Sequence, residues 1–236
     1  MKIIAHRGYS DLYPENTLIA FSQAISVGAG GIELDIHQLE DEFIVFHDWD
    51  MQRLTGCKLK ISDTSLEQVA QLKVNDHESI PKLSEVGALV RSQLPINIEI
   101  KSLKNVELFS QYLQNMISDF DCNLILSSFD HSLLNSCRLA LRKSAGNTIK
   151  YAGLVEQCPP LLAAYTEELE LEIAAINCHH VSQAFVDDAH ARGKEVWCYT
   201  VNTLNDLSAM YRMGVDAIFT DKPEWAKESI EQLYRA

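Results

Sequence analysis

Two acidic side chains separated by one residue could form the wall of a cation site. Glu33 and Asp35 alternate with Ile and Leu in the run GIELDIH, from residue 31 to residue 37. In a β-strand, alternating residues point to the same face, here roughly 7 Å apart. Two carboxylates that face an apolar core are costly unless a positive charge lies between them. The run therefore predicts a strand with an acidic face that binds a divalent cation.

A second run repeats this spacing. Glu99 and Lys101 are also two residues apart, in the segment INIEIK. If the two segments form neighbouring strands, Glu99 joins Glu33 and Asp35 as a third oxygen ligand. Carboxylate ligands of this kind favour Mg²⁺ or Ca²⁺ over zinc. We therefore expect one divalent cation, Mg²⁺ or Ca²⁺.

Histidine and arginine side chains fall at the ends of the same predicted strands. His6 and Arg7 follow the first strand, and His47 follows a short strand after the acidic one. Imidazole exchanges protons near neutral pH, and guanidinium groups stabilise anionic oxygens. These residue types suit general acid–base chemistry beside a bound cation. His37 shares the predicted acidic face and could be a fourth ligand, although we favour no such role.

Strands and helices must alternate to bring these residues together. Outside residues 40–82, hydrophobic periodicity predicts eight strands, each followed by a helix. The predicted strands cover residues 2–6, 31–37, 96–101, 123–127, 148–154, 173–177, 195–201 and 217–220. The first predicted helix has Asn16 as its N-cap, and the others cover residues 84–91, 106–120, 133–141, 161–168, 183–191, 204–213 and 223–234.

Eight strand–helix units in 236 residues predict an α/β protein with a (β/α)8 barrel (TIM barrel), in a single domain over residues 1–236. Such barrels carry their chemistry at the carboxyl ends of the strands. A doubly wound open sheet is the competing architecture, and it is disfavoured because no glycine-rich phosphate fingerprint follows the first strand.

Residues 40–82 interrupt the alternation. They contain a predicted strand over 43–46 and one short helix over 66–72, in an otherwise polar stretch. We interpret them as an insertion subdomain after the second strand, too small for a core of its own.

Composition limits the partners of the chain. The formal net charge is −13, which argues against binding to nucleic acid or to an anionic membrane surface. No apolar run is long enough for a signal peptide or a membrane span. The six cysteines show no CxxC spacing, which is typical of reduced thiols. We expect a cytoplasmic protein that acts on a small molecule without stable membrane association, and the oligomeric state stays open.

Short motifs occur in a fixed order over nearly the whole chain. They are HRG at residues 6–8, PENT at 14–17, ELD at 33–35, HD at 47–48, EIK at 99–101, YTVN at 199–202, GVD at 214–216 and TDKP at 220–223. This ordered set resembles the glycerophosphodiester phosphodiesterase family. The resemblance implies a (β/α)8 barrel with a small insertion after the second strand. It also implies hydrolysis of glycerophosphodiesters, such as glycerophosphocholine or glycerophosphoethanolamine, to sn-glycerol 3-phosphate and an alcohol.

The resemblance further implies a role for each matching side chain. Two histidines would form a general acid/base pair, three carboxylates would hold the metal, and two cations would contact the phosphate. An aromatic side chain, often Trp in the family, would pack against the glycerol or the alcohol. In this sequence these residues are His6 and His47, then Glu33, Asp35 and Glu99, then Arg7 and Lys101, and finally Tyr199.

Other functions compete with this interpretation. A related phosphodiesterase acting on lysophospholipids would need an apolar groove for an acyl chain. A metal-dependent sugar-phosphate isomerase or aldolase on the same scaffold would need a base beside a carbonyl group. A non-catalytic sensor of phosphorylated alcohols should lack one of the histidines or metal carboxylates, whereas this chain has them all.

Overall fold

A computed structural model describes residues 1–142 and 149–235 of the chain. Within these residues, eight parallel strands close into a barrel, because the first strand pairs with both the second and the last. The barrel strands are β1 (Lys2–Ala5), β2 (Gly31–Leu39), β6 (Ile96–Ser102), β7 (Leu124–Ser128), β8 (Lys150–Val155), β9 (Ile173–Asn177), β10 (Glu195–Tyr199) and β11 (Ala217–Thr220). The predicted (β/α)8 barrel is confirmed, and the open-sheet alternative is wrong.

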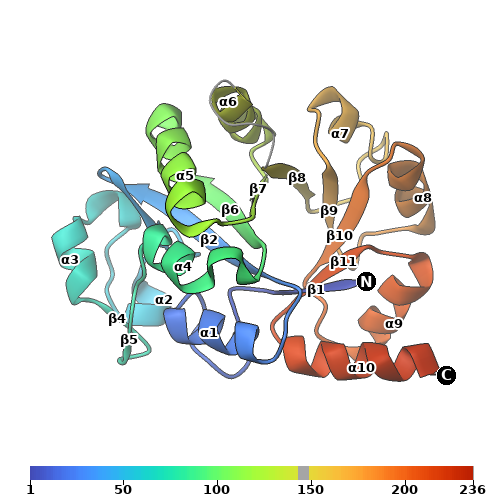
Figure 1. The fold of residues 1–236 in the computed structure, drawn as a ribbon, viewed down its shortest axis with the longest axis horizontal. Helices are drawn as coiled ribbons and strands as arrows, with labels where there is room; N and C mark the ends of the chain where they lie inside the picture. The colour runs from blue at the N-terminus through green and yellow to red at the C-terminus, as the bar shows by residue number, and fades with distance from the viewer. Residues whose placement is uncertain (143–148, 236) are drawn as a thin grey trace.

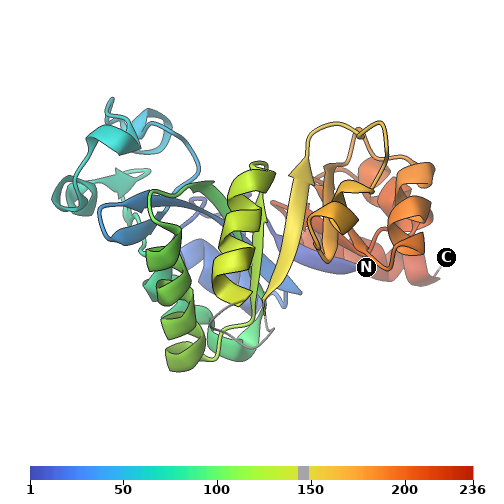
Figure 2. The ribbon, with the colours of Figure 1, turned by 90° about the horizontal axis from the view of Figure 1, so that it is seen from above.

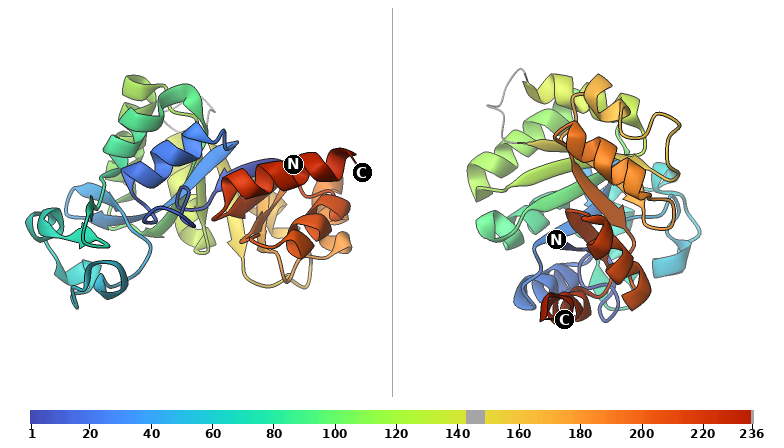
Figure 3. Two further views of the ribbon diagram at one scale, coloured as in Figure 1. Left: turned by 90° about the horizontal axis from the view of Figure 1, so that it is seen from below. Right: turned by 90° about the vertical axis from the view of Figure 1, so that its right-hand side faces the viewer.

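Helices surround the barrel on its outer side (Figures 1 and 3). In chain order they are α1 (Leu18–Ser26), α4 (Leu83–Val90), α5 (Val106–Phe120), α6 (His131–Arg142), α7 (Tyr165–Glu168), α8 (Gln183–Ala191), α9 (Leu204–Met213) and α10 (Pro223–Arg235), with the 3₁₀ turn η2 (Arg91–Gln93) after α4. The two chain termini both lie at the right of Figures 1 and 2.

Two local predictions are wrong. Thr17, not Asn16, is the N-cap of α1: the Thr17 hydroxyl accepts a hydrogen bond from the backbone N–H of Ala20. Asn16 has a φ of +57° and its side chain contacts a buried carboxylate instead. The helix predicted over 161–168 is reduced to α7, because the chain makes turns after two prolines and Leu162 has a φ of +52°, outside the helical region.

The remaining strand ends differ little from the predictions. β10 stops at Tyr199, two residues before the predicted end. β8 begins at Lys150, and the predicted start at residue 148 lies outside the described residues.

The alternation in β2 and β6 separates two environments. Ile32, Leu34 and Ile36 of β2 pack into the apolar layer between the strands and the helices. The intervening Glu33 and Asp35 point into the barrel, and β6 repeats the pattern. Across the barrel the interior is apolar, with a cluster that includes Ile4, Ala152, Leu154, Ile173, Ala175, Trp197 and Phe219. The acidic side chains are therefore confined to one wall.

The segment between β2 and α4 projects from one side of the barrel (Figures 1 and 2). It contains β3 (Glu42–Val45), which pairs antiparallel with β2, then α2 (Gln52–Thr55), the 3₁₀ turn η1 (Ile61–Asp63), α3 (Leu66–Gln71), β4 (Lys73–Val74) and β5 (Glu78–Ser79). A separate apolar cluster lies here, formed by Leu39, Ile44, Phe46, Met51, Leu54, Ile61, Val69, Val74 and Ile80. The expectation that this segment lacks an apolar core is wrong, since single buried side chains from several short elements and from the turns between them form a cluster without periodicity.

None of the described helices combines the length and hydrophobicity that a membrane span requires. The six cysteines are free thiols and four of them are buried: Cys122, Cys137, Cys178 and Cys198.

Candidate active site

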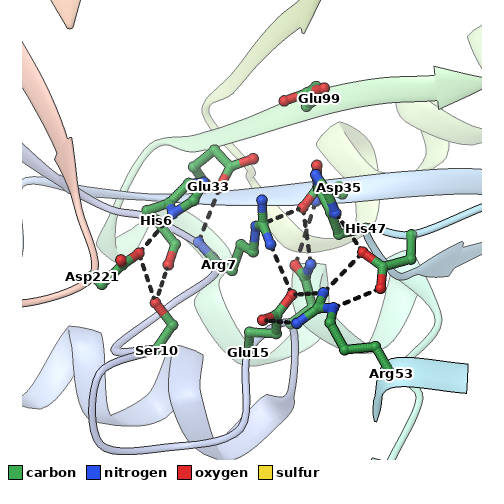
Figure 4. Close-up of polar contacts among 12 residues, drawn as sticks. His6, Arg7, Ser10, Glu15, Glu33, Asp35, His47, Arg53, Glu99 and Asp221 are labelled. Atoms are coloured by element: carbon green, nitrogen blue, oxygen red, sulfur yellow. Dashed lines mark hydrogen bonds and ion pairs between the residues drawn. The ribbon is translucent and has the colours of Figure 1, made fainter. Parts of the chain in front are cut away.

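Three carboxylates from adjacent strands meet inside the barrel (Figure 4). Glu33 and Asp35 of β2 and Glu99 of β6 each offer an oxygen atom within 4.8 Å of the other two. Glu33 and Asp35 are buried, and each has one oxygen without a hydrogen-bond partner. Buried carboxylate oxygens without partners are costly. This donor set fits a hard divalent cation.

Burial and mutual repulsion act on the acidity of these groups. Burial, together with the charges of Asp35 and Glu99, raises the pKa of Glu33 well above its usual range. Burial and Asp35 also raise the pKa of Glu99. Burial opposes ionisation of Asp35 too, but the charges of Arg7 and Lys101 hold its pKa below the usual range. The cluster therefore carries more negative charge than its protein neighbours balance.

Lys101 lies beside two carboxylates. Glu99 is two residues earlier in the same strand, and Asp35 is on the neighbouring strand β2. Its Nζ donates to Glu99 Oε1 at 2.7 Å and lies 3.6 Å from Asp35 Oδ1. Burial alone would lower the pKa of Lys101, but Glu99 and Asp35 outweigh it and raise that pKa. Lys101 is thus a protonated cation at this wall.

Arg7 reaches the cluster through an unusual turn after β1. Arg7 has a φ of +56° and Gly8 a φ of +82°. A Cβ on Gly8 would lie 2.7 Å from the carbonyl carbon of Ala20, so only glycine fits. The turn allows the Arg7 backbone N–H to donate to Glu33 Oε2 at 2.9 Å, while its Nε lies 3.3 Å from Asp35 Oδ2. Arg7 therefore contacts the acidic wall through both backbone and side chain.

His6 is oriented by the last strand of the barrel. Its Nδ1 donates to Asp221 Oδ1 at 2.7 Å, and its Nε2 lies 4.0 Å from Glu33 Oε2. Asp221 is itself held by Asn202 and Ser10, at 2.6 Å and 3.1 Å. Burial opposes ionisation of Asp221, yet the hydrogen bond and charge of His6 lower its pKa. The imidazole is therefore fixed with Nε2 toward the carboxylates.

His47 approaches the cluster from the inserted segment. Its Nδ1 donates to Asp48 Oδ1 at 2.7 Å. Figure 4 shows His6 at the Glu33 end of the acidic wall and His47 at the Asp35 end. Each histidine thus has a carboxylate partner on Nδ1, and the two flank the three acidic side chains.

His37 does not join the carboxylates. Its Nδ1 lies 3.0 Å from Ser102 Oγ, and its Nε2 donates to the His47 carbonyl oxygen at 3.4 Å. Burial lowers the pKa of His37 to about 4, so the ring is neutral. Both ring nitrogens contact protein groups, so the alternative in which His37 is a fourth ligand is wrong. The ring instead supports the backbone of His47.

A pocket with polar and aromatic lining adjoins the acidic wall. Its lining joins the site residues His6, Glu33 and Glu99 to Asn97, Ser127, Phe129, Leu154, Tyr199 and Phe219. The Tyr199 hydroxyl donates to the Val155 carbonyl oxygen at 2.7 Å, and the Tyr199 and Phe129 rings meet edge to face at 5.9 Å. The pocket therefore has one charged wall and one aromatic wall.

Comparison with known proteins places the chain in a family. Residues 6–225 match the glycerophosphoryl diester phosphodiesterase family. The chain is 32% identical to a glycerophosphodiester phosphodiesterase from Caldanaerobacter subterraneus subsp. tengcongensis, with 94% of each chain covered. The chain belongs to the glycerophosphodiester phosphodiesterase family. An enzyme of the same description from Bacillus altitudinis is 31% identical over 98% of this chain and 99% of its own.

Members of this phosphodiesterase family share the fold. A phosphodiesterase from Oleispira antarctica, solved in complex with the product sn-glycerol-3-phosphate, superposes with a TM-score of 0.87 at 24% identity, covering 98% of this chain and 97% of that one. At this identity the likeness supports the barrel alone.

The sequence interpretation missed several residues that contact the candidate site. Asp221 lay in a quoted motif without an assigned partner, as did Glu15, Asn16 and Asp48. Asn16 donates to Asp35 Oδ2 at 3.0 Å. Neither residue spacing nor a motif in the sequence pointed to Arg53, which lies in α2. Its partners are defined only by the folded chain.

Proposed function

We propose that this chain hydrolyses glycerophosphodiesters, such as glycerophosphocholine or glycerophosphoethanolamine, to sn-glycerol 3-phosphate and an alcohol. The observation that carries the proposal is the meeting of three carboxylates, two oriented histidines and two cations at one end of a family barrel. The named activity of the relatives and the bound product of the Oleispira antarctica phosphodiesterase support it.

We propose that Glu33, Asp35 and Glu99 hold one divalent cation, Mg²⁺ or Ca²⁺. Their oxygens are close enough to share an ion, and two buried oxygens have no hydrogen-bond partner in the protein. Hard carboxylate donors select such ions over zinc. When bound, a cation here would withdraw charge from the phosphoryl oxygens.

Arg7 and Lys101 would contact the phosphate. Both are protonated, largely buried cations beside the acidic wall. Arg7 contributes a planar fork of hydrogen-bond donors, and Lys101 contributes a point charge. Both stabilise the negative charge that develops on the phosphoryl oxygens during hydrolysis. Electrostatic stabilisation by such preorganised groups is the largest contribution that this wall can make.

His6 and His47 would act as the general acid/base pair. An ionised Asp221 or Asp48 accepts the Nδ1 hydrogen, so the neutral ring presents an Nε2 lone pair that can take a proton. One ring accepts a proton from the nucleophile, which is either a water molecule or a glycerol hydroxyl, and the other ring, protonated, donates a proton to the departing alkoxide. If the glycerol hydroxyl attacks first, a water molecule then opens the resulting cyclic phosphate to sn-glycerol 3-phosphate. Such catalysis contributes roughly 10²- to 10⁴-fold.

Tyr199 would pack against the glycerol or the alcohol. Its ring is held by the Val155 carbonyl and by Phe129 on the aromatic wall of the pocket. Carbon–hydrogen groups of the substrate match an aromatic wall, while the phosphate faces the charged wall.

We also propose that residues 1–236 form one barrel domain and that residues 40–82 are a subdomain within it that carries His47. The apolar cluster of this segment and the pairing of β3 with β2 support that division.

Release of sn-glycerol 3-phosphate from glycerophosphocholine tests the function. Activity should disappear in EDTA and return with Mg²⁺ or Ca²⁺, and turnover without a metal would contradict the three-carboxylate site. A parallel assay with lysophosphatidylcholine and with sugar phosphates separates the related lysophospholipid activity and the isomerase or aldolase alternatives.

His6→Ala and His47→Ala test the acid/base pair. Each should lower kcat by roughly 10²- to 10⁴-fold, while circular dichroism shows an unchanged fold. A near-normal rate in either variant would remove that histidine from the pair.

A further inference from the structure

One guanidinium joins two carboxylates beside the site (Figure 4). Arg53 lies in α2 of the inserted segment. Its Nε and Nη2 donate to the two oxygens of Asp48 at 2.6 Å and 2.9 Å. Its Nη1 and Nη2 donate to the two oxygens of Glu15 at 2.8 Å each. Arg53 is therefore bidentate to both carboxylates at once.

Each of these carboxylates holds a residue of the site. Asp48 accepts from His47 Nδ1 at 2.7 Å, and Glu15 accepts from Arg7 Nη1 at 2.8 Å. The contacts run from His47 through Asp48, Arg53 and Glu15 to Arg7 without a gap. These contacts link the inserted segment to the loop between β1 and α1. Glu15 and Arg53 are 38 residues apart in the sequence.

We propose that Arg53 is a positioning residue that fixes His47 and Arg7 relative to each other. This role in catalysis rests on the proposed function above. Without its guanidinium, two carboxylates that now share one cation would repel each other. The inserted segment would then shift against the barrel loop, and His47 would lose its alignment with the acidic wall. A misplacement of about 1 Å can cost roughly 100-fold in rate.

The geometry requires arginine at this position. Four hydrogen bonds in two parallel pairs use the planar fork of a guanidinium, whereas an ammonium group cannot bind two carboxylates in this way. The site is also accessible, because 47% of the Arg53 side chain is exposed while Glu15 and Asp48 are mostly covered. A small soluble cation could therefore replace the missing group.

Arg192 provides a matched control. It too bridges two carboxylates, Asp188 and Glu167, but at α8 and α7 on the outside of the barrel. Arg192→Lys and Arg192→Ala remove the same number of charges as the Arg53 variants and touch no residue of the site.

The first experiment compares steady-state kinetics with thermal unfolding. Arg53→Lys and Arg53→Ala should lower kcat by about 10- to 100-fold through His47 and raise KM through Arg7, at an assay temperature where thermal unfolding shows each variant to be fully folded. The Arg192 variants should keep both constants. A kcat of Arg53→Lys equal to that of the wild type would overturn the proposal.

The second experiment separates positioning from folding. Guanidinium chloride at low millimolar concentration should restore part of the kcat of Arg53→Ala and leave Arg192→Ala unchanged. Combining Arg53→Lys with Asp48→Asn should cost no more than the larger single effect, because both act through the same contacts. Additive losses, or a loss that follows a lowered unfolding midpoint without rescue, would overturn the proposal.

The third experiment does not depend on turnover. The Nδ1 hydrogen of His47 should give a protected imidazole signal in ¹⁵N-edited NMR of the wild type, and Arg53→Ala should lose it. If the wild type hydrolyses no glycerophosphodiester while this signal responds as expected, the proposed function fails and the positioning by Arg53 stands. A signal that is unchanged in Arg53→Ala rejects the positioning itself.

Discussion

At the amino-terminal end of the barrel, Glu195 receives three hydrogen bonds, whereas at the carboxyl-terminal end Glu33 and Asp35 each keep a buried oxygen without a hydrogen-bond partner. The donors to Glu195 are Lys150, Trp197 and Lys2, from three different strands. Burial works against ionisation of Glu195, but these donors lower its pKa to about 2. At the other end, burial raises the pKa of Glu33 well above its usual range.

The two ends of the barrel serve different purposes, stability at one end and chemistry at the other. A carboxylate that its own chain neutralises stabilises the fold, and it needs nothing from outside. A set of carboxylates with unused oxygens destabilises the unliganded fold and is available for a ligand. This division agrees with the general rule that barrel enzymes keep their chemistry at the carboxyl ends of the strands.

The largest expected contrast is catalytic. Glu99→Gln keeps the shape of the side chain but removes its charge from the acidic wall, so kcat should fall by about 10³-fold. Glu195→Gln, at the opposite end, should leave kcat unchanged. Parallel assays of glycerol 3-phosphate release measure both variants. A Glu99→Gln enzyme with a wild-type kcat would contradict a catalytic role for this carboxylate.

Cation binding should stabilise the folded protein, and this gain should depend only on the carboxylates at the carboxyl-terminal end of the barrel. Mg²⁺ or Ca²⁺ at about 100 times its dissociation constant should raise the free energy of unfolding by about 2.7 kcal/mol. Glu99→Gln should lose most of this increment, and Glu195→Gln should retain it. Thermal unfolding with and without EDTA makes the measurement, and equal stabilisation of both variants would place the cation elsewhere.

The same cation should bind more tightly as pH rises. Burial, Asp35 and Glu99 raise the pKa of Glu33, so part of the population carries a proton that a cation must displace. Titration calorimetry in buffers of different ionisation enthalpy should detect proton release that declines as pH rises through the pKa of Glu33. Binding without proton exchange at every pH would contradict the raised pKa.

Glu195 should protect the fold against acid. Its folded-state pKa of about 2 lies below the ordinary value of 4.5, so its contribution is fully present above pH 4.5 and is lost as pH falls through 2. Glu195→Gln should lower the free energy of unfolding by about 1 to 2 kcal/mol at pH 7, allowing for partial exposure. Denaturant titrations at pH 7 and pH 3 should show a smaller difference at the lower pH.

The smallest expected effect is an increase in the free energy of unfolding. Glu33→Gln removes a buried charge whose raised pKa costs stability as pH rises above the usual range of a carboxyl group. The unliganded variant should therefore be more stable than the wild type by about 1 kcal/mol at pH 8, although it should be inactive. A less stable variant in EDTA would mean that Glu33 is balanced by its own neighbours, as Glu195 is.

Local geometry explains what could be predicted. The two-residue spacing places Glu33 and Asp35 on one face of β2, and Glu99 and Lys101 on one face of β6, because side chains alternate in any strand. The pairing of Asp35 with Glu99 in the sheet then brings the two pairs to the same side. Eight strand–helix units in this length then leave few architectures. These features, with the ordered motifs, were enough to predict the barrel and to select the candidate residues at one end of it.

Which partners hold those residues depends on how the whole chain folds. His6 meets Asp221 across 215 positions, because closing the barrel brings β1 beside β11. Asn16 leaves the N-cap position, which its residue type favours, and binds Asp35 instead. Arg53 contacts Asp48 and Glu15 only when the inserted segment lies against the barrel. Sequence determines the face and spacing of side chains through short-range geometry, whereas long-range pairing depends on where chain closure brings distant backbone together.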